Sequence, residues 1–273
     1  MKTATILTLS LLAGTCGPAL ATTFSNDVTD LWWNPDESGW GVNLIQQSNV
    51  VFATFFVYDS LGQPHWYVAS DMRAENVPTD RPYEFSGALY ETTGPAFSAP
   101  VFNPAAVTRR QVGSANFEFI PPDTGTLTYS VDGVSVTKQV RRQTWAANDP
   151  SGQYTAAQVT QKSPFAAAGC NAPTGLQTFD QVAVALAGNS FTMTASRVSP
   201  SGGRCQYAGT YSQAGHMGAV DGAFTCDGGS NGTFTLRELE VGVHGFAGNY
   251  DASDRGCQVY GNFAAVRANG NDK

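Results

Sequence analysis

Apolar and polar residues alternate with a period of two along most of this chain, and short turn signals interrupt the alternation, which is typical of antiparallel strands. The pattern is clearest in the second half, where an aromatic residue repeatedly follows glycine by two positions, at Gly152/Tyr154, Gly209/Tyr211, Gly222/Phe224, Gly232/Phe234, Gly248/Tyr250 and Gly261/Phe263. Residues i and i+2 share one face of a strand, so each motif places a gap beside a large ring. Rings from neighbouring strands can fill such gaps in a small barrel.

Each half of the chain contains enough alternating segments for a sheet that closes on itself. The second half predicts strands over residues 152–160, 178–186, 191–198, 205–213, 218–226, 232–239, 243–250 and 257–266. The first half predicts strands over residues 41–47, 50–58, 65–71, 83–90, 112–120, 125–131 and 134–141, the last two joined by an Asp132-Gly133 hairpin turn. We therefore predict an all-β fold with two antiparallel up-and-down barrel-like domains, similar to calycin or lipocalin barrels.

The first 21 residues have the features of a cleaved export signal. Lys2 precedes an apolar run over residues 6–12, and Ala19-Leu20-Ala21 is a small-x-small cleavage pattern. No later stretch is apolar for the ~18 residues that a transmembrane helix needs. We therefore expect a secreted or periplasmic protein that has a signal peptide at 1–21, a Trp-rich domain at 22–147 and a Gly-rich domain at 148–273.

Four cysteines remain after the expected cleavage, and all of them lie in the second domain: Cys170, Cys205, Cys226 and Cys257. An even number in an exported chain predicts two disulfides, and the lack of a C-x-x-C pair argues against a metal site. Repeat symmetry favours the pairs Cys170–Cys205 and Cys226–Cys257, whereas hairpin geometry favours Cys205–Cys226. Both alternatives stay open at this point.

The segment from Trp32 to Gly41, with the sequence WWNPDESGWG, holds three of the five tryptophans. Together with FATFFVYDSLGQPHWYV and VDGVSVTKQVRRQTW it resembles an uncharacterised family of secreted proteobacterial proteins with the N-terminal motif W-W-N-P-x-E-S-G-W-G. The resemblance covers residues 31–145. It implies export and a bacterial origin, and it implies no activity.

The tryptophans have two main interpretations, because such side chains either fill a core or form a binding surface. In the structural interpretation Trp40 opens the first strand and plugs the barrel beneath a basic side chain of the last strand, as in lipocalin-like barrels; the plug would comprise Trp40, Arg141, Arg142 and Trp145. In the binding interpretation a cleft at the barrel mouth is lined by Trp32, Trp33, Trp66, Tyr67, His65, Asp36 and Glu37. A calcium loop is a weaker alternative, because Ile45 stands where the loop would need glutamate.

The chain carries a net charge of −7, and neither half is basic, so nucleic acid is not an expected partner. We find neither a G-x-S-x-G nor an H-E-x-x-H motif, and we expect no cofactor and no metal. The leading hypothesis is a secreted, non-catalytic binding protein for a carbohydrate or a small amphipathic ligand. The alternatives are a structural envelope or extracellular matrix protein without a ligand and, less favoured, a hydrolase that uses a carboxylate with His65.

Overall fold

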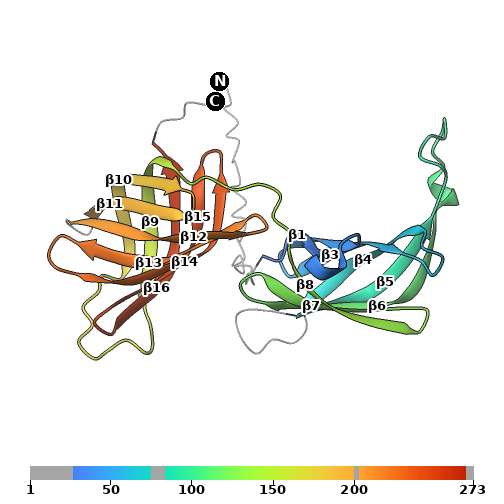
Figure 1. Ribbon diagram of the computed structural model, residues 1–273, viewed down its shortest axis with the longest axis horizontal. Helices are drawn as coiled ribbons and strands as arrows, with labels where there is room; N and C mark the ends of the chain where they lie inside the picture. The colour runs from blue at the N-terminus through green and yellow to red at the C-terminus, as the bar shows by residue number, and fades with distance from the viewer. Residues whose placement is uncertain (1–26, 75–83, 200–202, 269–273) are drawn as a thin grey trace, which may run out of the picture.

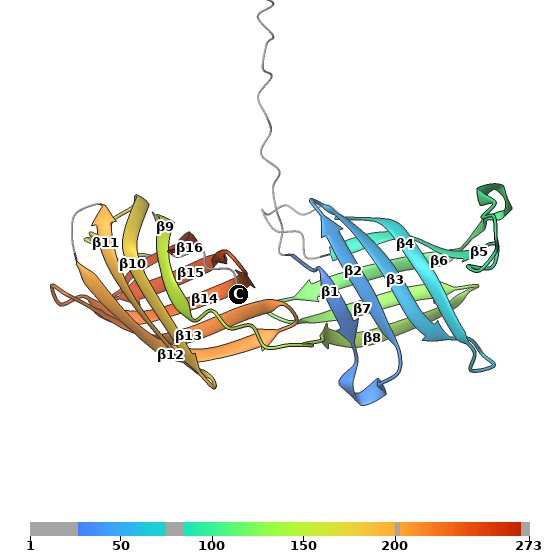
Figure 2. The ribbon, with the colours of Figure 1, turned by 90° about the horizontal axis from the view of Figure 1, so that it is seen from above.

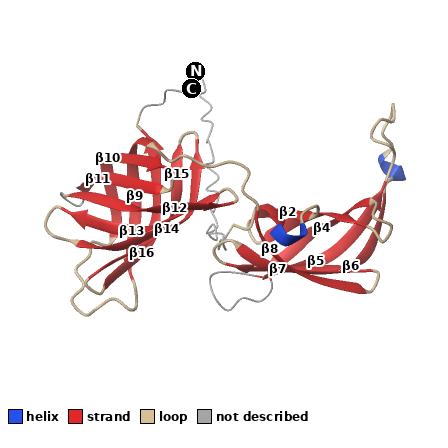
Figure 3. Cartoon of the chain, viewed as in Figure 1, coloured by secondary structure: helices blue, strands red, loops and turns tan. Residues whose placement is uncertain are grey.

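The structure, a computed structural model, describes residues 27–74, 84–199 and 203–268, apart from the side chains at positions 180 and 199. The expected signal peptide lies outside these residues. The described chain is all-β and forms two closed antiparallel barrels, as predicted (Figures 1 and 3). Its helical segments are the short 3-10 helices η1 (Pro35–Glu37) and η2 (Pro104–Ala106). The described residues include no helix of the length and hydropathy that crossing a membrane requires.

Barrel 1 is an up-and-down meander in which each strand pairs with the next, and β1 returns to β8 to close the sheet. Its strands are β1 (Asp30–Trp33), β2 (Gly41–Gln47), β3 (Val50–Tyr58), β4 (Pro64–Ala74), β5 (Glu84–Thr93), β6 (Thr108–Ile120), β7 (Thr124–Val131) and β8 (Val134–Arg142). The sequence did not predict β1, because this strand is only four residues long and its Trp32-Trp33 pair breaks the alternation.

Barrel 2 has the same topology, and β9 pairs with both β10 and β16. Its strands are β9 (Gly152–Lys162), β10 (Gly175–Ala187), β11 (Ser190–Ser199), β12 (Arg204–Ala214), β13 (Met217–Cys226), β14 (Asn231–Gly242), β15 (Gly245–Asp254) and β16 (Cys257–Arg267). Each corresponds to a predicted strand. The connection between the barrels covers residues 143–151, so the predicted boundary at 147/148 falls within it.

Both barrels are closed by the same contact between their first and last strands. In barrel 1, Trp32 lies opposite Arg142, whose guanidinium carbon is 4.9 Å from the indole centroid. In barrel 2, Tyr154 lies opposite Arg267 at 5.2 Å. The polar tip of each ring donates a hydrogen bond to the carbonyl four residues earlier, over 2.9 Å in Trp32 and 2.7 Å in Tyr154. The arginine therefore joins the ends of the sheet and covers a buried aromatic ring.

The two barrels differ in how their interiors are filled. The interior of barrel 1 holds large, fully buried side chains such as Trp32, Phe55, Phe85 and Phe117. Glycines lie opposite aromatic residues in barrel 2, as the Gly-x-aromatic motifs predict: Gly222 faces Phe234 across β13 and β14, and Gly261 faces Tyr250 across β15 and β16. A Cβ atom at position 222 would lie 2.7 Å from the Phe234 ring, so the ring occupies the place of a side chain.

Barrel 2 also carries both disulfides. Cys205 pairs with Cys226 directly across β12 and β13, and Cys170 pairs with Cys257 at the start of β16. Hairpin geometry therefore predicted the Cys205–Cys226 pair correctly, Cys170–Cys257 is the pair that remains, and the pairs drawn from repeat symmetry are wrong. The repeat describes strands, whereas a disulfide needs two cysteines that are neighbours in space.

The two barrels meet at a joint made by β1, the connection 143–151 and the β12–β13 turn, which reaches toward β1 (Figure 2). His216 Nδ1 lies 2.8 Å from Asp30 Oδ2, which also accepts a 2.8 Å hydrogen bond from Arg142. The backbone N–H of Gly215 donates to Thr144 Oγ1 over 2.9 Å. The arginine that closes barrel 1 thus shares a carboxylate with barrel 2.

Candidate functional site

Barrel 2 encloses a cavity of about 690 Å³ between its inward-facing side chains. The walls are mainly apolar and aromatic, and they come from every strand of the barrel; the rings are Phe179, Tyr207, Phe224, Phe234, Phe246, Tyr250 and Phe263. Several small inward residues, among them Ala156, Ala195 and Ala265, leave the space between these rings open. A cavity of this size and lining is typical of a small-molecule site.

A short row of polar side chains crosses the apolar wall. Gln177, which is 1% exposed, donates from Nε2 to the Thr160 hydroxyl over 2.6 Å, and this hydroxyl also contacts the hydroxyl of Tyr250. The Oε1 atom of Gln177 is buried without a hydrogen-bond partner among the described residues. Burial raises the pKa of Tyr250 to about 12, so this hydroxyl keeps its proton at neutral pH. A buried acceptor without a donor is costly, and a ligand could supply the missing donor.

Arg197 brings a positive charge to the same cavity. It lies on β11 opposite Phe179 of β10, and its guanidinium carbon is 5.9 Å from the Phe179 ring. Its Nε atom is buried without a hydrogen-bond partner among the described residues. Ala195 lies two positions earlier on the same strand and also lines the cavity, so both side chains face inward.

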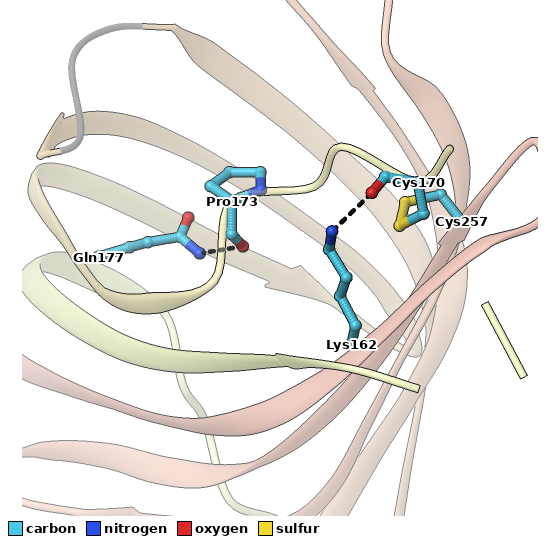
Figure 4. Close-up of a disulfide and its surroundings, with 5 residues drawn as sticks. All are labelled: Lys162, Cys170, Pro173, Gln177 and Cys257. Atoms are coloured by element: carbon cyan, nitrogen blue, oxygen red, sulfur yellow. Dashed lines mark hydrogen bonds between the residues drawn. A yellow bond between two sulfur atoms is a disulfide. The ribbon is translucent and has the colours of Figure 1, made fainter. Parts of the chain in front are cut away.

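One end of the cavity lies under the connection between β9 and β10, residues 163–174, which contributes wall residues from Ala167 to Pro173. The Cys170–Cys257 disulfide ties this loop to β16, and Lys162 Nζ donates to the Cys170 carbonyl over 2.6 Å (Figure 4). Gln177 also donates to the Pro173 carbonyl over 3.2 Å, so the loop and the polar row are connected. The disulfide therefore holds a cavity wall in place.

The plug of barrel 1 is Trp32, not Trp40 as predicted. Trp32 is 0% exposed and contacts Phe117 edge to face, with ring centroids 4.9 Å apart. Trp40 is half-buried and donates from Nε1 to Glu37. The predicted arrangement of a tryptophan under an arginine is present, but it uses the short strand that the sequence did not reveal.

The other predicted plug residues lie apart from this contact. Arg142 is buried against Trp32, as described above, whereas Arg141 points to the opposite side of β8 and pairs with Asp123 at 3.3 Å. Trp145 is 74% exposed in the connection between the barrels and contributes nothing to the plug. Adjacent residues on a strand face opposite sides of the sheet, so the Arg141-Arg142 doublet could place only one arginine over a buried ring.

The residues of the predicted binding cleft do not line one surface. Trp32 is buried, Trp33 is half-buried opposite Arg141, and Trp66 is 49% exposed on the outer face of β4. His65 and Tyr67 share the other face of β4, with ring centroids 4.6 Å apart. Burial raises the pKa of Tyr67, which packs against the core. The aromatic cluster of the sequence is therefore divided between the core and two faces of the sheet.

The two acidic residues of the predicted cleft, Asp36 and Glu37, also do not line a common cleft. The Glu37 carboxylate accepts hydrogen bonds from Lys138 Nζ at 2.6 Å and from Trp40, and the Lys138 contact lowers its pKa. Asp36 is exposed at η1, where Asn34 Oδ1 caps its backbone N–H over 2.9 Å. This cap shapes the segment that the calcium-loop alternative would use, as a turn that leads into β2. Among the described residues no group of three or more His, Cys, Asp or Glu side chains could hold a metal.

His65 approaches a carboxylate that sequence reasoning did not select. Its Nε2 atom lies 3.0 Å from Glu91 Oε1, and Arg110 contacts the same carboxylate at 2.7 Å and Asp132 at 2.5 Å. His65 therefore adjoins a chain of ion pairs, made by Glu91, Arg110 and Asp132, that spans β5, β6 and the turn after β7. The chain joins neighbouring strands at this end of barrel 1.

Sequence reasoning missed the polar groups of the cavity, namely Arg197, Gln177, Thr160, Tyr207 and Tyr250. The alternation shows that these residues lie on one face of their strands, but it does not show whether the interior of a barrel is filled or hollow. The available signal was the accumulation of Gly and Ala at inward positions of the second domain.

No protein-family model, no curated protein and no solved structure matches the chain, and the family resemblance over residues 31–145 stays a prediction.

Proposed function

We propose that the protein is an exported, non-catalytic binding protein whose second barrel holds a small, mainly apolar ligand. The observation that carries this proposal is the cavity of about 690 Å³, with its aromatic walls and few polar groups. Burial of apolar ligand surface supplies the driving force, at ~25 cal/mol per Å². Barrel 1, whose interior is filled, then serves as the structural partner of a hollow barrel.

Export is part of the same proposal. The two disulfides support an oxidising compartment, and the first 21 residues have the pattern of a signal peptide. The proposal does not need a cofactor or a metal.

A neutral fluorescent probe, N-phenyl-1-naphthylamine, tests ligand binding directly. We expect saturable enhancement of its fluorescence by the wild-type protein. Ala195→Leu adds bulk inside the cavity and should weaken binding about tenfold, while Trp66→Ala removes an exposed ring of barrel 1 and should leave the affinity unchanged. No saturable binding, or equal binding by Ala195→Leu with its fold intact, contradicts the proposal.

A carbohydrate-binding site is the second candidate function, and its location would be the outer face of barrel 1. Trp66 lies opposite Phe56 across β3 and β4, and both rings are exposed. Flat, exposed rings are suited to stacking on sugars. Titration of the intrinsic fluorescence with cellohexaose and chitohexaose tests this candidate. A fluorescence change that is lost in Trp66→Ala and kept in Trp33→Ala supports a carbohydrate site on this face. The absence of any fluorescence change in the wild-type protein contradicts it.

A further inference from the structure

The guanidinium of Arg197 is the feature of the cavity that an apolar ligand alone does not explain. Arg197 faces inward from β11, between the small side chain of Ala195 and the edge of the barrel, and it lines the cavity together with Phe179. The Phe179 ring attracts the guanidinium charge through a cation–π contact. An aromatic face provides no lone pair for the buried Nε–H, so this donor has no acceptor among the described residues.

Two carboxylates line the cavity, and neither pairs with Arg197. Asp227 Oδ2 accepts a hydrogen bond from the backbone N–H of Arg204 at 3.3 Å. Asp254 Oδ1 lies 3.4 Å from Arg255 Nε and is buried without a hydrogen-bond partner among the described residues. Among the side chains that the structure describes, none forms an ion pair or a hydrogen bond with the guanidinium of Arg197. Arg197 is half-buried and its Nε–H is buried without an acceptor among the described residues, so a bound anion would supply both an acceptor and a counter-charge.

The surroundings of Arg197 favour an anion over a neutral polar group. Its positive charge acts on the hydroxyl-bearing rings of Tyr207 and Tyr250, which stand on β12 and β15 and also line the cavity. Burial raises the pKa of both tyrosines, so their hydroxyls remain protonated and able to donate. Arg197 and these hydroxyls provide donors on one part of the wall, whereas Gln177 Oε1 and Asp254 Oδ1 are acceptors elsewhere in the lining. The planar guanidinium matches the two oxygens of a carboxylate.

We propose that Arg197 anchors the carboxylate of an amphipathic ligand inside barrel 2, while the apolar part of that ligand lies among the phenylalanine rings of the cavity. This inference rests on the proposed function, since it names the class of ligand for the same site. The ligand class is a monocarboxylic acid with an aliphatic or aromatic body. The phenylalanines supply affinity, and Arg197 discriminates between the acid and its neutral analogues.

Displacement of N-phenyl-1-naphthylamine by decanoate and by methyl decanoate at pH 7.5 separates these contributions, because the two competitors differ mainly in charge. For the wild-type protein we expect decanoate to bind about tenfold more tightly than the ester. Arg197→Met should remove this preference, so that decanoate and the ester displace the probe equally once each is compared with the variant's own affinity for the probe. Arg197→Lys keeps the charge without the planar fork and should restore part of the preference.

A measurement on the wild-type protein keeps the inference testable if the variants do not fold. The ¹³C chemical shift of the labelled carboxyl carbon reports the pKa of decanoate while it is bound. This pKa should be lower than that of free decanoate, because Arg197 stabilises the anion. An acid in an apolar cavity without such an anchor would have a raised pKa. Equal displacement by acid and ester, or a raised pKa of the bound acid, overturns the inference. Failure of the neutral probe and the ester to bind instead overturns the proposed function itself.

Discussion

At the scale of single residues, the same side-chain types have different roles depending on the face of the strand that carries them. Trp32 is a core residue, Trp66 is a surface residue and Trp145 lies in the connection between the barrels. Residue type alone therefore does not identify a binding site. Position in the barrel decides whether a tryptophan contributes to stability or is available for a ligand.

Trp32→Ala should lower the free energy of unfolding by about 3–5 kcal/mol, since it leaves a large cavity beneath Arg142 and removes a buried hydrogen bond. Trp145→Ala, the matched control at an exposed ring, should change it by no more than about 0.5 kcal/mol. Guanidinium-induced unfolding followed by circular dichroism measures both. A similar loss for the two variants would show that Trp32 is not the plug.

At the scale of elements, strand number and order follow from alternation and turn residues, and the sequence predicted fifteen of the sixteen strands found in the described residues. Strand β1 was missed because only four residues form it, and its identity as a strand depends on the distant β8. The cavity was missed for a similar reason. Whether a barrel interior is filled depends on the summed volume of inward side chains from all eight strands, which no single segment reveals.

The pairing of glycines with rings is specific enough to test. Gly222→Ala should lower the free energy of unfolding by about 1–3 kcal/mol, because the new methyl group would collide with the Ala208 carbonyl and the Phe234 ring. Gly242→Ala is the control, since a Cβ atom there meets only the Gly245 carbonyl at 3.8 Å. We expect that variant to be neutral or slightly stabilising in thermal unfolding. Equal stability of the two variants would contradict the packing described for barrel 2.

At the scale of the whole molecule, two barrels with the same topology and the same closing contact have different interiors. The joint connects them through His216, Asp27, Asp30 and Arg142. Hydrogen bonds to Asp27 and Asp30 raise the pKa of His216 from 6.5 to about 9. The imidazole is therefore charged in the folded protein at a pH where it is neutral in the unfolded chain.

This pKa predicts how stability depends on pH. Because the pKa of His216 is higher in the folded than in the unfolded chain, its protonation adds to the free energy of unfolding. This contribution is fully present below pH 6.5 and is lost as the pH rises through about 9. Melting temperatures of the wild-type protein should therefore fall by several degrees more than those of His216→Asn over this interval. His244→Asn changes an exposed histidine and should behave like the wild type. Identical pH profiles for His216→Asn and the wild type would exclude a charged joint.

The difference between the barrels predicts that a ligand enters barrel 2, which is hollow, and not barrel 1, which is filled. Titration of isotopically labelled protein with methyl decanoate, followed by two-dimensional NMR of the backbone amides, shows which barrel the ligand enters. We expect shifts confined to residues that line the cavity, including Ala156, Ala195 and Ala265, and no shift at Trp66 or within β1. Shifts confined to barrel 1, or no shift in barrel 2 at saturating ester, would contradict this prediction.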